Sequence, residues 1–196
     1  GIHWAIFDFE NNYKLIELST SSILELGKLG TFDEDGVMGC QIFHRGNEKF
    51  LYYQGWNLSI STPFRNSIGL ALYNEKMGQF EKMYNGPILD RSIHDNCFVA
   101  TPNVFELAKN KYLMYYLSCD SWEEGLVNPI HKYNIKIAES KDGIIWNREG
   151  KIAIDYNSND EFAFSVPRII NEDSIYKMWF SYRSFKNDGT YRIGYA

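Results

Sequence analysis

The sequence is short of cysteine, of long apolar runs and of basic clusters, and each shortage argues against a class of protein. Its three cysteines, Cys40, Cys97 and Cys119, are an odd number without C-x-x-C spacing. This argues against a disulfide framework or a zinc site and predicts reduced thiols in a cytoplasmic protein. No apolar run approaches the length of a membrane span and no signal peptide opens the chain, so no membrane partner is expected. Lysine and arginine are scattered among acids at a net charge of -5, so no nucleic-acid partner is expected either.

Helical periodicity is also nearly absent, whereas aromatic residues are abundant. They make up 16% of the sequence, with 14 tyrosines and 13 phenylalanines. Aromatic side chains fit the half-buried surface of a pleated sheet. A hydrophobic fraction of 44% and a charged fraction of 23% are typical of a globular protein. The composition therefore favours an all-β fold.

Internal repeats indicate which all-β fold this is. Three equivalent positions are each followed, 13 residues later, by an aromatic residue: Gly39 by Tyr52, Pro102 by Tyr115, and Pro167 by Phe180. An Ile-x-x-Ala signature recurs four times, with its alanines at Ala5, Ala71, Ala138 and Ala196. A further apolar piece follows it at 23–24, 87–89 and 151–154. Each repeat therefore holds four short strands, which predicts the antiparallel blades of a β-propeller.

The repeat boundaries predict one propeller domain over residues 1–196. They give the end of one blade (1–29), a second blade (30–90), a third (91–155) and most of a fourth (156–196). About three blades' worth of chain is too little for a closed ring, which needs roughly four to eight blades. Open sheet edges aggregate unless they are covered. We therefore expect a fragment of a longer chain, with the assembly of copies into an oligomer as the alternative.

Acidic residues precede the three predicted inner strands at matching places. Asp33 lies six residues before Gly39, Asp95 seven before Pro102, and Glu161 six before Pro167. Equivalent points of a ring converge on its axis, and carboxylates brought together there cannot all ionise easily, so one pKa rises. A proton donor beside a proton acceptor is what glycosidic cleavage requires. The alternative is that acid-rich turns before strands are simply common.

Several polar and aromatic residues are predicted to lie at the same rim and to bind a sugar. They are Trp56, Asn57, Arg65, His94, Arg168 and Arg183. The planar fork of an arginine suits a carboxylate, a phosphate or sugar hydroxyls, although an ion pair with the mouth acids is an equally open interpretation. His131 is predicted to lie in a solvated loop. The histidines show no metal motif, so no metal and no cofactor are expected.

One run of residues resembles a known family. Residues 139–146, Glu-Ser-Lys-Asp-Gly-Ile-Ile-Trp, resemble the E-S-x-D-G-x-x-W strand–turn–strand of five-bladed propellers related to glycoside hydrolase families 43 and 32. Residues 30–71 resemble bacterial members of that superfamily, some from polysaccharide gene clusters. The resemblance implies a five-bladed ring, with calcium in the channel of some relatives. It also implies roles for Asp33 as base or nucleophile, Asp95 as pKa modulator and Glu161 as general acid.

The expected function is thus that of a glycosidase-like enzyme with a carbohydrate substrate. One alternative is a carbohydrate-binding propeller without catalysis, which predicts acids that lie apart or are held in ion pairs. Another is a glycoside phosphorylase or glycosyl-transferring enzyme. That alternative predicts an anion pocket made by Arg65 with Arg168 or Arg183.

Overall fold

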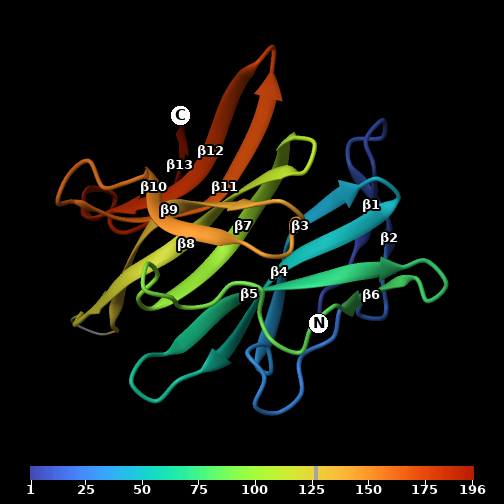
Figure 1. The fold of residues 1–196 in the computed structure, drawn as a ribbon, viewed down its shortest axis with the longest axis horizontal. Coiled ribbons are helices and arrows are strands. Elements are labelled where there is room, and N and C mark those ends of the chain that lie inside the picture. The colour runs from blue at the N-terminus through green and yellow to red at the C-terminus, as the bar shows by residue number, and fades with distance from the viewer. Residues whose placement is uncertain (126–127) are drawn as a thin grey trace.

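The chain folds into antiparallel β-sheets that fan out around a common line of inner strands (Figure 1). The computed structural model describes residues 1–125 and 128–196. In these residues the helical structure is one 3₁₀ turn, η1 (Phe185–Asn187). The prediction of an all-β fold is therefore confirmed, while the number of blades in a closed ring stays a prediction.

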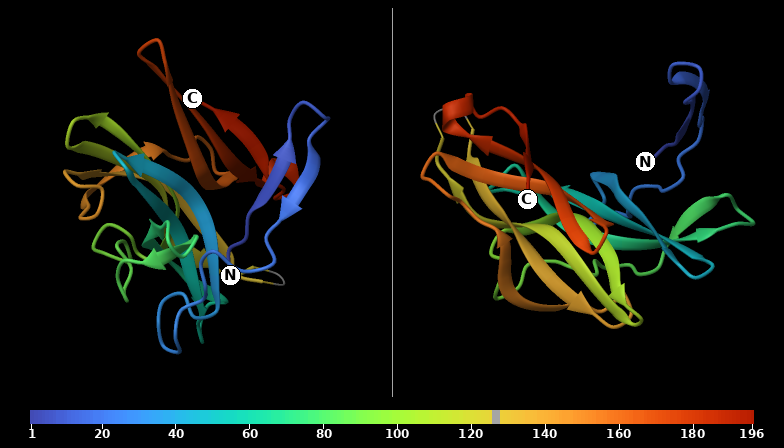
Figure 2. Two further views of the ribbon diagram at one scale, coloured as in Figure 1. Left: turned by 90° about the vertical axis from the view of Figure 1, so that its right-hand side faces the viewer. Right: turned by 90° about the horizontal axis from the view of Figure 1, so that it is seen from above.

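The first unit is a four-stranded sheet in sequential order. It consists of β3 (Gly36–Arg45), β4 (Glu48–Leu58), β5 (Phe64–Asn74) and β6 (Gln79–Lys82). All three pairings are antiparallel. It is preceded by a two-stranded hairpin of β1 (Ala5–Asp8) and β2 (Lys14–Leu18), which extends from the body of the molecule (Figure 2).

The second and third units share one seven-stranded sheet. The second unit comprises β7 (Phe98–Ala108), β8 (Lys111–Glu123), β9 (Ile130–Ser140) and β10 (Asn147–Ile154). The third comprises β11 (Glu161–Glu172), β12 (Ile175–Ser184) and β13 (Arg192–Tyr195). The two units are joined by a single parallel pair, Ala163 with Tyr133, between β11 and β9. Sequence alone predicted separate blades and did not reveal this junction.

The innermost strands of the three units are β3, β7 and β11, and they are tied together by side chains that bond the neighbouring backbone. Gln41 of β3 bonds both the N–H and the C=O of Val104 on β7. Asn103 of β7 accepts from the N–H of Ile169 on β11 at 3.0 Å. Arg168 donates to the carbonyl of Cys40 at 2.9 Å. Strands that diverge from an axis cannot form a continuous ladder of backbone hydrogen bonds between units. Side chains therefore pair with these backbone groups instead.

The cores lie between neighbouring units. Alternate residues of β4 and β8 face the same layer, so Tyr52 and Tyr116 are both buried there with Ile68, Val104 and Met114. A second core packs Ile135 of the second unit against Phe164 and Met178 of the third. The first two units thus bury apolar side chains on both faces of their strands, which explains why these strands are rich in apolar residues in the sequence.

The fourth strand of the first unit was predicted wrongly. It is formed by β6 and not by residues 87–89, since Ile88 and Leu89 only bridge to Ile68. Asn74 accepts the N–H of Lys76 at 3.1 Å and so closes the β5–β6 turn. Only Phe80 of β6 is apolar, so the period-two pattern of a strand is invisible there.

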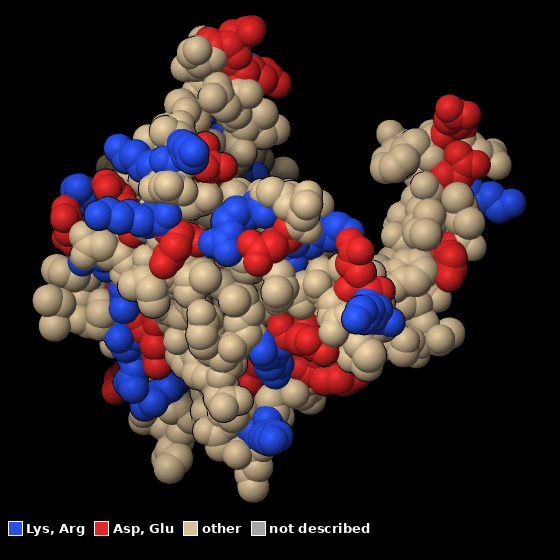
Figure 3. All heavy atoms as spheres, turned by 45° about the vertical axis from the view of Figure 1, so that its right-hand side comes forward, with Lys and Arg blue, Asp and Glu red and all other residues tan. Residues whose placement is uncertain are grey.

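Charged side chains of both signs are interspersed over the face shown in Figure 3. Among the residues that the structure describes, no helix has the length and apolar character needed to cross a membrane.

Candidate functional site

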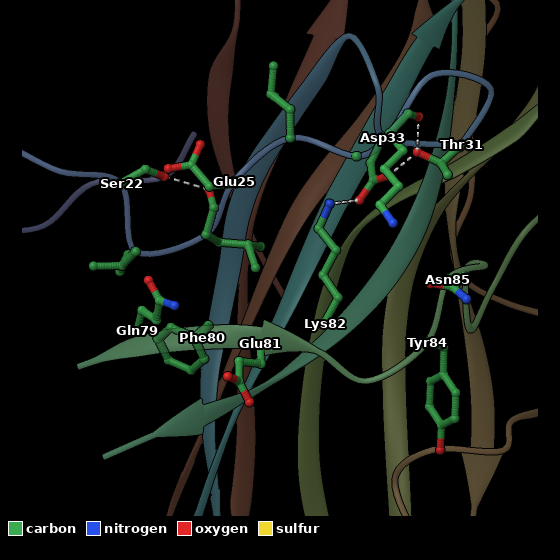
Figure 4. Close-up of a pocket in the computed structure, with 15 residues that line it drawn as sticks. Ser22, Glu25, Thr31, Asp33, Gln79, Phe80, Glu81, Lys82, Tyr84 and Asn85 are labelled. Carbon is green, nitrogen blue, oxygen red and sulfur yellow. Dashed lines mark hydrogen bonds and ion pairs between the residues drawn. The ribbon is translucent and has the colours of Figure 1, made fainter. Parts of the chain in front are cut away.

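Asp33, predicted to be catalytic, is buried in a set of contacts within the first unit (Figure 4). Its exposed fraction is 1%. Thr31 donates to Oδ1 at 2.9 Å and Tyr53 donates to Oδ2 at 3.0 Å. The Nζ of Lys82 on β6 lies 2.6 Å from Oδ2. We call Asp33, Thr31, Tyr53 and Lys82 the Asp33 clip.

Asp95 is held in the same way in the second unit. Its exposed fraction is 0%. Tyr116 donates to Oδ1 at 3.1 Å, while Ser92 and Arg148 donate to Oδ2 at 2.7 and 2.9 Å. We call these four residues the Asp95 clip. In both clips an acid before the first strand meets a tyrosine on the second strand and a cation on the fourth.

The two tyrosines are fixed as hydrogen-bond donors. Burial raises the pKa of Tyr53, and the nearby carboxylate of Asp33 raises it further. Burial raises the pKa of Tyr116 in the same way, with Asp95 as the second cause. Both phenols therefore stay protonated at neutral pH and keep donating to the carboxylates. The clips hold the loops before β3 and β7 onto their own sheets.

Glu161, the third predicted acid, lies at the start of β11 and is half-buried. Its Oε2 accepts the N–H of Asn157 at 2.7 Å. Among the described residues it has no lysine or arginine at ion-pair distance, whereas its neighbour Asp160 pairs with Lys186 at 3.0 Å. In the hydrogen bonds and ion pairs of the described residues, Asp33, Asp95 and Glu161 share no partner. The structure therefore places the three acids in three separate environments.

A cavity of about 370 Å³ lies where the three units meet. It opens beside the inner strands and takes side chains from every unit, so we call it the three-unit cavity. Among the residues that the structure describes, the lining mixes polar and apolar side chains and includes no acidic residue, lysine or arginine: Met38, Gln54, Phe64, Asn66, Phe98, Ala100, Thr101, Leu117, His131, Tyr133, Ser165, Val166, Ser181 and Tyr191.

An aromatic wall forms one side of this cavity, and His131 is part of it. The imidazole lies 4.7 Å from the ring of Trp122 and is stacked at 5.2 Å on Tyr133. Phe64 reaches the same ring from the first unit at 5.7 Å. Burial lowers the pKa of His131 to about 4, with the charge of Arg183 as a further cause, so the ring is neutral at pH 7. The prediction of a solvated loop histidine was wrong, because β9 already begins at Ile130.

Strained backbone borders the cavity on two inner strands. Thr101 and Val166 have φ angles of 45° and 52°, and each sits at a β-bulge directly before a proline. The left-handed region is costly for β-branched residues. The Oγ1 of Thr101 accepts the N–H of Val166 at 3.1 Å, which joins the two bulges. Such strain is concentrated at functional sites in other proteins. The signal for this strained backbone in the sequence was a β-branched residue directly before Pro102 and before Pro167.

Of the predicted sugar-binding residues, Trp56 lies beside the three-unit cavity. It lines a neighbouring hollow of about 320 Å³ that shares Gln54, Phe64 and Asn66 with the cavity. Asn57 pairs with Arg65 across the β4–β5 hairpin.

The three predicted arginines do not form an anion pocket. Arg65 is exposed. Arg168 donates to the carbonyls of Pro167 and Cys40. Arg183 donates to the carbonyl of Gly189 at 2.6 Å and lies over the ring of Tyr191 at 5.2 Å. The guanidinium groups of Arg168 and Arg183 therefore already donate to backbone carbonyls, whereas a phosphate site would need them for the phosphate oxygens.

His94 and the acidic residues form no metal site. The carbonyl of His94 accepts from Lys136 at 2.6 Å, and its ring lies against Gly150 of β10. Over residues 1–125 and 128–196, no three histidine, cysteine or acidic side chains gather as a metal-binding group.

Comparison of the coordinates with solved structures identifies the architecture. A glycoside hydrolase superposes with a TM-score of 0.74 at 15% identity, over 96% of this chain and 53% of its own. The chain shares its fold with a glycoside hydrolase. A second solved structure, an RGII complex of BT0996, matches with a TM-score of 0.72 at 14% identity, over 93% of this chain and 52% of its own. At these identities the likeness concerns the fold alone.

Two sequence relatives come from Mycobacterium tuberculosis. The uncharacterized proteins Rv1502 (strain ATCC 25618 / H37Rv) and MT1551 (strain CDC 1551 / Oshkosh) are each 32% identical over 189 residues. The match covers 96% of this chain and 60% of each relative. The chain therefore spans about three-fifths of the length of these relatives. No family model matches the sequence.

Proposed function

We propose that the three-unit cavity binds a carbohydrate and that the protein is a glycosidase-like enzyme, which cleaves or transfers a glycosidic bond. The observation that carries this proposal is the lining of the cavity, where amide, hydroxyl and imidazole groups surround an aromatic wall. Ligand sites typically combine apolar walls with a few polar groups that orient the ligand. A sugar presents hydroxyls around an apolar ring face and so suits such a lining. The shared fold with a glycoside hydrolase supports the same choice.

Among the three predicted acids, we propose Glu161 as the general acid. It lies outside the lining of the three-unit cavity, at the start of the strand that brings Ser165 and Val166 there, so the bond that it protonates would lie toward that end of β11. The roles of Asp33 as base or nucleophile and of Asp95 as modulator remain predictions. Each of these two carboxylates would first have to leave the cation of its clip, which is unfavourable for a buried ion pair.

The test is hydrolysis of a panel of aryl glycosides by the protein and by Glu161→Gln. We expect the variant to lose at least about a hundredfold in kcat, the scale of general acid catalysis. Glu172→Gln is the matched control, because Glu172 lies on the same strand but pairs with Lys177 at its far end. Unchanged activity of Glu161→Gln would remove Glu161 from the mechanism.

The two clips favour a second candidate, a propeller that binds carbohydrate without cleaving it. This candidate expects acids that are held in ion pairs, as Asp33 and Asp95 are. To separate the two functions, binding of the same glycosides is measured by titration calorimetry with the protein and with Ser181→Trp, which fills the cavity. Binding that is lost in this variant, together with no turnover by the unaltered protein, would establish the second candidate. Ser121→Trp, on β8 away from the cavity lining, is the control.

A further inference from the structure

Two side-chain atoms of residues that line the three-unit cavity are buried and have no hydrogen-bond partner among the described residues. They are the Oε1 of Gln54, on β4, and the Nδ1 of His131, on β9. Buried polar atoms of native proteins are nearly always hydrogen-bonded. Where such an atom belongs to a side chain that lines a cavity, a molecule bound in that cavity can supply the missing partner.

The protonation of His131 decides what such a partner must offer. Because burial lowers its pKa to about 4, the ring is neutral at pH 7 and carries one proton. A neutral imidazole has one donor nitrogen and one acceptor nitrogen. With the proton on Nε2, the buried Nδ1 is an acceptor. Both Gln54 and His131 then require O–H or N–H donors.

The charge of the surroundings restricts the ligand further. Within the described part of the chain, the residues that line the cavity include no acidic residue, lysine or arginine. Arg183, whose charge acts on the histidine, donates to the carbonyl of Gly189 and lies over the rings of Phe162 and Tyr191. A carboxylate, phosphate or ammonium group in the cavity would lose water without a counter-charge in the lining, which is unfavourable.

From these contacts we infer that the three-unit cavity selects an uncharged sugar, whose hydroxyls donate to Gln54 Oε1 and His131 Nδ1. This inference rests on the proposed function and specifies its substrate class. Gln54 and His131 lie on different units, and recognition of the sugar requires a hydrogen bond to each of them. Acidic, phosphorylated and amino sugars are excluded by the same lining.

The probes are methyl glycosides of glucose and galactose, with glucuronic acid, galacturonic acid, glucose 6-phosphate and glucosamine as charged counterparts. Binding is measured at pH 7 by ligand-observed NMR and calorimetry. We expect at least one neutral sugar to bind, and its charged counterpart to bind at least about tenfold more weakly. Gln54→Leu and His131→Phe keep the shape of the lining and should each weaken the neutral sugar by about tenfold. Gln79→Leu and His44→Phe are matched controls outside the cavity and should bind as the unaltered protein does.

The outcomes separate the inference from the proposed function. If sugars bind but the charged members bind equally well, or if Gln54→Leu and His131→Phe bind normally, the inference is overturned while carbohydrate binding stands. If no sugar binds, both fail. Melting of Gln54→Leu gives an independent reading, since the loss of an unpaired acceptor should leave the melting temperature equal or higher. A marked drop would show that the amide already has a structural partner and would overturn the inference.

Discussion

Removal of the Arg148 cation should reveal how much the Asp95 clip contributes to stability. In Arg148→Met the long apolar stem is kept, so the packing against β9 changes little. The guanidinium, which donates to Asp95 Oδ2 at 2.9 Å, is lost. Asp95 then stays fully buried with only Ser92 and Tyr116 as donors. A buried carboxylate without its counter-charge is the unfavourable state that this variant creates.

The expected loss is about 3–5 kcal/mol in the free energy of unfolding, as for other buried ion pairs that lose one partner. For a chain of this size each kcal/mol lowers the melting temperature by about 2–4 °C, so a fall of roughly 10 °C is expected. Asp95→Asn/Arg148→Met removes both charges and should be more stable than Arg148→Met alone. The coupling between the two positions should be at least about 1 kcal/mol.

Urea unfolding followed by tryptophan fluorescence measures these differences. Lys151→Met serves as the control, because Lys151 lies on the same strand as Arg148 but its ion pair with Glu149 is exposed, and its unfolding curve should be unchanged. An Arg148→Met curve that coincides with that of the control would show that the clip is not a stabilising element. An absence of coupling in the double variant would refute the ion pair itself.

Three further predictions follow from the same structure. Lys82→Met should destabilise the protein through Asp33, but by less than Arg148→Met, since Arg148 also donates to the carbonyl of Asp90; equal or greater loss by urea unfolding would contradict this. Val166→Asn should raise the free energy of unfolding by about 1 kcal/mol, because asparagine tolerates positive φ better than valine, and a fall would argue against backbone strain. The pKa of His131 is lower in the folded protein than in the unfolded chain, so the unfolded chain binds the extra proton first. Stability should therefore fall as the pH drops from about 6.5 to about 4, and His131→Phe should flatten that part of the curve.

The repeat pattern predicted the strands because it reflects local geometry. The tight turns between first and second strands show this local geometry, since Asn110 and Asp173 adopt positive φ there, at 59° and 53°. The strand β6 was missed because its burial depends on one side chain, Phe80. The sheet junction at Ala163 was missed because it is a single pair between segments with no local signature.

The acids show where prediction from the sequence reached its limit. Asp33 and Asp95 do occupy equivalent places in their repeats, as predicted. Their partners Lys82 and Arg148 are 49 and 53 residues further along the chain, so no local pattern announces the pairing. The cavity was invisible for the same reason: Gln54 and His131 are far apart in sequence and belong to different units.

Each clip draws its acid, its phenol and its cation from one repeat. A repeat therefore balances its own buried charge, whichever repeat stands next to it. Lysine in the first unit and arginine in the second both supply the positive charge, so the ion pair can be kept when one of these residues replaces the other. A repeat that contains both partners of its buried ion pair can be duplicated, deleted or moved without leaving an unpaired charge in the interior. Any growth of a repeat protein by gene duplication has to meet this condition.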